Sequence, residues 1–284
     1  MHSEPRLALG NGRRPLSVAC HVMNSLFFHV VLLAYLLASL TFWFHLGLRR
    51  RWIYQFASGL LAGGFVLQTV LLGYRLWTQT FLSWDHVYAY LGLLSWAIVA
   101  VYLITVWRYP IDALGAFIVP LAFLAAAVSG VPDITPTTLP TAFRNLWLGI
   151  HIFVALLGYA ALTLMFCAGV MYLMQESQLK SKRPGALYHR LPSLSLLDDL
   201  NGRALIMGFP LLTQGIVTGS IWAKYLHGSY LHWSLTSLPL LLAWLMYALL
   251  LAGRFALGWR GKKAAFAAVG GFIVVLVSYF VHAL

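Results

Sequence analysis

The chain of 284 residues is 61% hydrophobic and only 9% charged, whereas soluble domains carry about 25% charged residues. So few charged side chains cannot cover a soluble globule, and the mean hydropathy of +0.81 excludes an ordinary soluble protein. The formal net charge of +12 invites a nucleic-acid interpretation. The basic residues, however, stand in short clusters at the ends of apolar runs, which is the pattern of membrane orientation. We therefore expect a polytopic membrane protein that binds no nucleic acid.

Apolar runs follow one another along the chain, each near the length of about 20 residues that crosses a bilayer. Backbone groups in lipid must be hydrogen-bonded internally, so runs of this length are helices. We predict an all-α integral membrane protein, a bundle of about eight transmembrane helices, at residues 24–48, 53–74, 87–107, 111–130, 146–174, 204–222, 238–257 and 264–282. Residues 1–23 are then an N-terminal tail, and 24–284 form a single polytopic membrane domain.

The lysines and arginines divide unevenly among the connections between these runs. Odd-numbered connections hold thirteen of them, including the Arg49–Arg51 cluster, and even-numbered connections hold only three. The positive-inside rule places the odd connections in the cytoplasm and both termini on the outer face. We expect the bacterial inner (cytoplasmic) membrane as the location, with multiple passes through its lipid bilayer.

This orientation gathers potential ligands on the outer side of the membrane. His151 is the clearest candidate, because it lies inside the apolar fifth run, where an imidazole usually faces a bundle interior or a cavity. A hydrogen-bonded packing histidine without a functional role is the other interpretation of this residue. The other candidates close the last run or stand in outer loops, and they are His282, His86, His227, His232, Tyr230 and Trp233. A tryptophan or tyrosine at such a place can also be an interfacial anchor. For His45 and His189, at span ends, we expect hydration or a bond to a free backbone group.

Two sequence patterns point to one family. The stretch from Gly219 to Gly261 holds a loop, "HGSYLHWSL", then an apolar run, then "GWRG" and a last run; the fifth run reads W-x-x-x-H-x(7)-Y-A from Trp147 through His151 and Tyr159. Over about residues 71–280 this resembles the cytochrome c assembly family, the membrane haem-handling proteins of the CcsA, CcmC and HemX type. That family has an external tryptophan-rich loop, a histidine helix before it, and a G-W-R-G exit.

The resemblance implies a haem site. It makes His151 an axial ligand of the iron of haem b on the outer side, with a second ligand from His282, His227, His232 or His86. Trp233 and Tyr230 would offer the porphyrin an aromatic platform, since axial ligation and burial are the means by which proteins tune haem iron.

The loop also departs from the family pattern. His227 and Leu231 stand at the places of two tryptophans, and Ser234 replaces the aspartate. The paired histidines that would lead haem through from the cytoplasm are also missing, because Ala252 stands where the family has its inner-end histidine. These departures resemble HemX-like members, which have a degenerate tryptophan-rich loop.

Three functions follow as hypotheses. The first is a membrane haem-handling protein that binds haem near the outer face and assists c-type cytochrome biogenesis, with an apocytochrome c or another assembly subunit as partner. It would not itself be an enzyme, because no nucleophile–base pair is visible. The hypothesis with the least support is a small-solute transporter, since the apolar runs hold almost none of the charged residues that mark transport pathways.

The alternative to haem handling is a HemX-type non-enzymatic regulator of haem biosynthesis, acting on glutamyl-tRNA reductase. Such a soluble enzyme would dock on the connection at residues 175–203. There we expect a short helix with one leucine face, made of Leu191, Leu194, Leu196 and Leu197. A solvated connector on the membrane surface is the other interpretation of this segment.

Overall fold

The computed structural model describes residues 14–77, 87–130, 146–181, 185, 188–227 and 237–283, and their side chains within 25–75, 77, 90–130, 149–181, 185, 188–221, 223–224 and 238–277. The described elements are helices, in the order α1 (Arg14–Leu48), α2 (Arg51–Trp77), α3 (Val87–Arg108), the short 3₁₀ turn η2 (Asp112–Leu114), α4 (Gly115–Ser129), α5 (Leu146–Lys180), α6 (Leu194–His227), α7 (Ser237–Ala256) and α8 (Lys262–Ala283). No strand occurs among these residues, so the prediction of an all-α protein is confirmed.

Seven of the helices, α1 to α7, contain stretches that are long and apolar enough to cross a membrane within the described residues. α8 occupies the place of the eighth predicted span. Together these helices make the chain a multi-pass α-helical membrane protein. Backbone hydrogen bonds inside each helix explain why this architecture suits lipid, where no water can satisfy free N–H and C=O groups.

Several helices run further than the apolar pattern predicted. α1 begins at Arg14, so residues 14–23 of the expected N-terminal tail are helical. The fifth span was expected to end at Met174, but α5 continues to Lys180, where the Lys180 Nζ lies 2.6 Å from the Glu176 carboxylate one turn earlier. The sixth was expected from Ala204, but α6 already begins at Leu194, and the Ser193 hydroxyl accepts a hydrogen bond from the Leu196 N–H at 3.4 Å. Apolar runs mark the membrane-embedded part of a helix, whereas ion pairs and capping side chains extend it into water.

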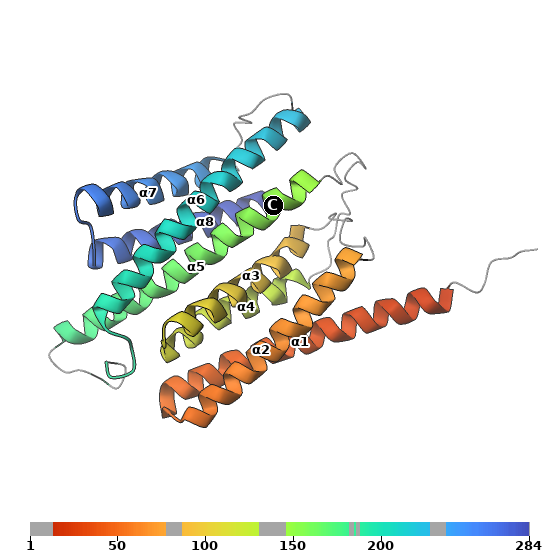
Figure 1. Ribbon diagram of the computed structural model, residues 1–284, viewed down its shortest axis with the longest axis horizontal. Coiled ribbons are helices and arrows are strands. Elements are labelled where there is room, and N and C mark those ends of the chain that lie inside the picture. Colours follow the sequence, from red (N-terminus) through yellow and green to blue (C-terminus); the bar gives the residue numbers. More distant parts are fainter. Residues whose placement is uncertain are drawn as a thin grey trace, which may run out of the picture.

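Figure 1 shows that successive helices run in opposite directions along one bundle axis. The turns after α1, α3, α5 and α7 therefore lie at one end, which we call the basic end because it carries the Arg49–Arg51 cluster. α5 begins and both α6 and α8 finish at the opposite end, where the chain terminus is marked (Figure 1). The grouping of connections expected from the charge pattern is thus seen in the fold, while the assignment of the basic end to the cytoplasm remains a prediction.

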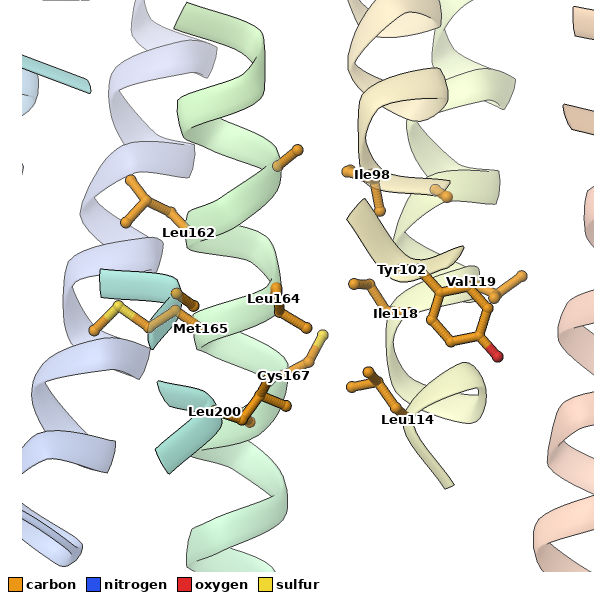
Figure 2. Close-up of a cluster of buried hydrophobic side chains, with 14 of the residues drawn as sticks. Ile98, Tyr102, Leu114, Ile118, Val119, Leu162, Leu164, Met165, Cys167 and Leu200 are labelled. Carbon is orange, nitrogen blue, oxygen red and sulfur yellow. The ribbon is translucent and has the colours of Figure 1, made fainter. Parts of the chain in front are cut away.

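The bundle consists of two halves. In the first half α1 packs on α2 and α4, and α3 on α4; in the second α5 packs on α6 and α8, and α7 on α8. The halves meet where α3 and α4 face α5. Figure 2 shows Leu164 and Cys167 of α5 projecting toward Leu114 and Ile118 of the first half, and all four side chains are buried. Such contacts hold membrane helices together by van der Waals packing, because lipid is as apolar as leucine.

Two successive buried hydrogen bonds join three helices of the first half. The Tyr35 hydroxyl of α1 donates to Gln68 Oε1 of α2 at 2.6 Å, and Gln68 Nε2 donates to the Gly92 carbonyl of α3 at 2.9 Å. Both side chains are almost fully buried, at 0% and 8% exposure. Polar groups buried in an apolar bundle find protein partners because unsatisfied ones are costly, and these bonds set the register of α1, α2 and α3.

Candidate functional site

His151 lies near the start of α5 and is half-buried against α6. Its Nδ1 is 2.8 Å from the hydroxyl oxygen of Thr218. That hydroxyl is 2.6 Å from the Gln214 carbonyl and 3.1 Å from the Gly215 carbonyl of its own helix. A threonine hydroxyl has one proton, and the shortest of these contacts assigns it to the Gln214 carbonyl. Thr218 therefore accepts a hydrogen bond from Nδ1–H, and the free lone pair of the imidazole is on Nε2.

This arrangement fits a role in haem ligation. A ligating histidine usually donates its other ring N–H to a protein acceptor, which fixes the tautomer and the ring orientation. Thr218 is such an acceptor for the Nδ1–H of His151.

The position of His151 depends on small residues along the α5–α6 contact. A Cβ placed on Gly219 would lie 3.0 Å from His151 Cε1, so the imidazole occupies the space that a larger residue would take. One turn further in, a Cβ on Gly215 would lie 3.2 Å from the Ala155 Cβ. Gly215 and Gly219 form a G-x-x-x-G pair, the spacing with which membrane helices approach closely. The pair faces His151 and Ala155, which have the same spacing on α5.

The same close contact continues toward the basic end. A Cβ on Gly158 of α5 would lie 3.0 Å from the backbone nitrogen of Leu212, and one on Gly208 of α6 would lie 3.1 Å from the Ala161 Cβ. α5 and α6 therefore pack as antiparallel neighbours over most of their length, as Figure 1 shows. Because α5 and α6 are in contact over most of their length, the packing of the whole helix pair places His151 against Thr218.

The remaining predicted site residues lie outside what the structure describes at the level of side chains. For His227 and His282 the structure gives only the helix to which each belongs, α6 and α8 respectively. Nothing is described for His86, Tyr230, His232 and Trp233. The ends of α6 and α8 lie at the end of the bundle where α5 begins (Figure 1). The predicted gathering of these residues with His151 is therefore untested.

Trp244 and Tyr247 of α7 make packing contacts. The Trp244 indole donates to Thr213 Oγ1 of α6 at 2.9 Å and lies over Phe209 with ring centroids 5.7 Å apart. Tyr247 is fully buried, and a Cβ on Gly271 of α8 would come 2.7 Å from its ring. These two aromatic residues hold α7 against α6 and α8.

The "GWRG" segment is a turn between α7 and α8. Gly258 and Gly261 have φ angles of 64° and 67°, a left-handed conformation that favours glycine because other residues have a Cβ clash there. The Trp259 N–H donates to the Gly253 carbonyl at 3.0 Å, and the Gly261 N–H donates to the Asp198 carboxylate of α6 at 2.7 Å. The "GWRG" part of the sequence resemblance is thus a structural turn. It is anchored by Asp198, which belongs to α6 and lies within the expected connection at residues 175–203.

The leucine face expected on the connection at 175–203 is wrong for two of its members. Leu191 and Leu197 are buried in the core, at 7% and 0% exposure, and Leu197 belongs to the first turn of α6. A helix that packs on its own bundle turns its apolar side inward, so these leucines are not available to a soluble partner.

His45 contacts a backbone group, as expected, but that group is not a free one, because the Arg50 carbonyl also accepts from the Ile53 and Tyr54 N–H groups. The His45 Nδ1 lies 3.2 Å from the carbonyl oxygen of Arg50, a backbone group in the turn between α1 and α2. His189 is exposed, which agrees with the hydration expected for it, and its ring lies edge-on to the ring of Tyr188, with centroids 5.1 Å apart.

Sequence reasoning missed Thr218 and Gly219 as partners of His151. A signal was present, because Gly215, Gly219 and Thr218 stand on one stretch of a long apolar helix, and small residues at a spacing of four predict a helix contact. Which helix they contact could not be predicted without the fold.

Comparison with known proteins places these observations in a family. The family model described as "Cytochrome C assembly protein" matches residues 84–284, well over half of the chain. The chain is 31% identical over 288 residues to the cytochrome c biogenesis protein CcsA of Parasynechococcus marenigrum (strain WH8102), covering 93% of each chain. It is also 31% identical over 245 residues to CcsA of Synechococcus sp. (strain CC9902), covering 78% of this chain and 81% of the relative.

A more distant relative, CcsA of Guillardia theta, is 25% identical over 271 residues, covering 88% of this chain and 90% of the relative. The three relatives are named as CcsA proteins. The closer likeness to HemX-type members, expected from the degenerate loop, stays a prediction.

Proposed function

The chain belongs to the cytochrome c assembly protein family, and from that premise we propose that it is a membrane component of c-type cytochrome biogenesis that binds haem b through His151. The proposal places the site at the end of the bundle opposite the basic end, facing the outer side of a bacterial inner membrane. The observation that carries it is the hydrogen bond from His151 Nδ1 to Thr218, which directs the lone pair of the ring to Nε2.

A second residue that would hold haem is proposed among His282, His227, His232 and His86. α6 ends at His227 and α8 at Ala283, both at the end of the bundle where α5 begins (Figure 1), and this supports a second haem-binding residue from that end. Trp233 and Tyr230 are proposed as the aromatic platform beside the porphyrin. In this role bound haem supplies the group that becomes joined to an apocytochrome c, and that protein or another assembly subunit is the proposed partner.

The chain's own residues would bind and orient haem. His151 offers Nε2, Thr218 holds the ring in one tautomer, and Gly219 leaves the ring its place against α6. A supporting Nδ1–H hydrogen bond strengthens the basicity of the ligating nitrogen. This proposal assigns no catalytic residue to the chain.

The test is an optical spectrum of the protein purified in detergent, before and after addition of haem. We expect a Soret band that is lost in His151→Gly and restored when free imidazole is added, because imidazole can fill the space left by the missing side chain. The matched control is His29→Ala, since His29 is a histidine of α1 whose Nδ1 lies 2.6 Å from the Ser25 carbonyl of its own helix.

Two results would contradict the proposal. One is a wild-type protein that takes up no haem at micromolar concentration; the other is a Soret band that is unchanged in His151→Gly. Loss of the band in both His151→Gly and His29→Ala, without rescue by imidazole, would show misfolding in place of ligand loss.

A further inference from the structure

A cavity of about 590 Å³ opens among residues at the basic end of the bundle. His151 lies near the start of α5, and α5 begins at the opposite end (Figure 1). Three separate parts of the chain line the cavity: the turn between α1 and α2, the η2 turn before α4, and the connection between α5 and α6. Its polar lining consists of His45, Arg49, Arg51, Tyr54, Asp112 and Arg190, and we call it the arginine pocket. Its volume is within the range of small-molecule sites, about 300–1,000 Å³.

The charge in the arginine pocket is not balanced. Three arginines face one aspartate. Among the described residues the ion pairs are Lys180–Glu176 and Arg254–Asp198, so none of the three arginines has a carboxylate of the described part within ion-pair distance. Like charges that converge on one cavity repel each other unless an anion lies between them. The lining therefore favours an anionic ligand.

Arg49 adds a second, independent observation. Its φ angle is 54°, and its N–H donates to the His45 carbonyl at 2.9 Å, which is the left-handed position that ends many helices and usually holds glycine. A residue with a Cβ is less stable there by about 1 kcal/mol. Backbone strain of this kind concentrates at functional sites. Glycine would be more stable at position 49, but only arginine places a guanidinium at the cavity.

The surroundings of the arginine pocket suit a lipid. Phe44, Leu48 and Trp52 each precede or follow a lining residue in the sequence, and their exposed fractions are 64%, 62% and 67%. These three side chains are exposed on α1 and α2 beside the pocket, and an exposed apolar surface on a membrane protein suits contact with lipid chains. An anion held in the pocket can thus have its apolar part against this surface.

We propose that the arginine pocket binds a phosphate group, as carried by the headgroup of an anionic phospholipid. Guanidinium groups form paired, charge-assisted hydrogen bonds to phosphate oxygens. Basic pockets between membrane helices on the cytoplasmic side bind such headgroups, and the charge pattern predicts that side for the basic end. The cavity is larger than a lone phosphate requires, and Asp112 can accept a hydrogen bond from a headgroup hydroxyl.

A headgroup in this pocket would join the two halves of the bundle. Arg49 and Arg51 belong to the first half, while Arg190 stands before α6 of the second. A further contact crosses at the same end, where the Arg203 guanidinium of α6 lies 5.6 Å from the ring centroid of Tyr109. Because a ligand that binds only the folded state stabilises it, occupancy should raise the thermal stability of the full chain.

The experiment measures lipid binding by native mass spectrometry and melting temperature in detergent, with three additions in parallel arms. The arms are phosphatidylglycerol, zwitterionic phosphatidylcholine, and glycerol phosphate as a soluble phosphate ester. We expect phosphatidylglycerol to remain bound and to raise the melting temperature, with little effect of phosphatidylcholine. An equal effect of glycerol phosphate would assign the same phosphate site to a soluble ligand.

Variants identify the site. Arg49→Gly removes one guanidinium and relieves the left-handed backbone, so the fold is kept; Arg51→Gln and Arg190→Gln remove the others. We expect each to weaken phosphatidylglycerol binding about tenfold or more, as expected for losing a hydrogen bond to a charged group. Arg50→Gln is the matched control, because Arg50 stands in the same turn but does not line the pocket.

The proposal is overturned if phosphatidylglycerol binds no better than phosphatidylcholine and glycerol phosphate has no effect. It is also overturned if Arg49→Gly and Arg50→Gln weaken binding equally, since a general surface charge would then explain the preference. The haem spectrum of these variants is expected to be unchanged, so this result is independent of the function proposed for His151.

Discussion

Arg254 of α7 and Asp198 of α6 form a largely buried ion pair in which the guanidinium reaches both carboxylate oxygens, at 2.9 and 3.3 Å. The two side chains are only 10% and 12% exposed. The guanidinium also donates to the Asp198 backbone carbonyl at 3.0 Å, and the Gly261 N–H shares the same carboxylate at 2.7 Å. One acidic residue therefore holds α6, the end of α7 and the start of α8 in a single network, which explains why an arginine and a G-W-R-G turn occur together.

Replacing Asp198 by asparagine should destabilise the protein strongly. Removing one charge of a buried pair leaves the other uncompensated, and this costs about 3 kcal/mol or more. We expect a clear fall in the melting temperature of the detergent-solubilised protein. Glu176→Gln is the control, because its partner Lys180 is 64% exposed and surface pairs contribute about 0–1 kcal/mol. Equal melting temperatures for the two variants would contradict the structural role of Asp198.

The two turn glycines should differ in their tolerance of alanine. Gly258→Ala should lower the free energy of unfolding only by the cost of the left-handed backbone, about 1 kcal/mol, because no atom lies near its Cβ position. Gly261→Ala should be worse, since the new Cβ would also lie 2.8 Å from the Tyr172 hydroxyl. Gly270→Ala, within α8, should be neutral or stabilising, with Met246 Cε at an ordinary 3.6 Å. Chemical or thermal unfolding of the three variants ranks them, and the reverse order would refute this account of the turn.

Thr218→Val tests the hydrogen bond that orients His151. Valine has nearly the shape of threonine but cannot accept the Nδ1 proton, and loss of such a supporting contact weakens metal binding about 10-fold or more. We expect weaker haem uptake in a titration followed at the Soret band. Thr213→Val is the control: it removes the hydrogen bond to Trp244 on the same helix without touching the histidine. A titration curve unchanged in Thr218→Val would separate His151 from its proposed orienting partner.

Gly219→Ala tests the space that the imidazole occupies. The added Cβ would lie 3.0 Å from His151 Cε1, so the ring must move or the helices must separate, at about 1–3 kcal/mol for overpacking. Both haem uptake and melting temperature should fall. In Gly149→Ala, near the start of α5, the new Cβ meets nothing within 4 Å. That variant should behave like the wild type in both measurements. If it lowers haem uptake and melting temperature as much as Gly219→Ala does, the steric explanation is wrong.

The sequence was sufficient for the class of the protein because of one physical rule. In lipid the backbone must satisfy itself, so each long apolar run in this chain indicates a helix, and the clustering of arginines at alternate connections indicates which helix ends lie together. His151 was found for the same reason, since a histidine inside such a run is conspicuous. Helix ends at Lys180 and Leu194 were missed because they lie in polar sequence, where ion pairs and capping decide where a helix stops.

Only the tertiary structure decided which residues meet. Asp198 and Arg254 are 56 positions apart, His151 and Thr218 are 67 apart, and no periodicity in either helix states that they pair. The arginine pocket combines a turn after α1 with Arg190, before α6. Hydrophobicity along one chain determines that helices form and cross the membrane, whereas the fit of small residues such as Gly215 and Gly219 against a particular neighbour determines how those helices pack. That fit is a property of two surfaces together, and so it is read only from the folded chain.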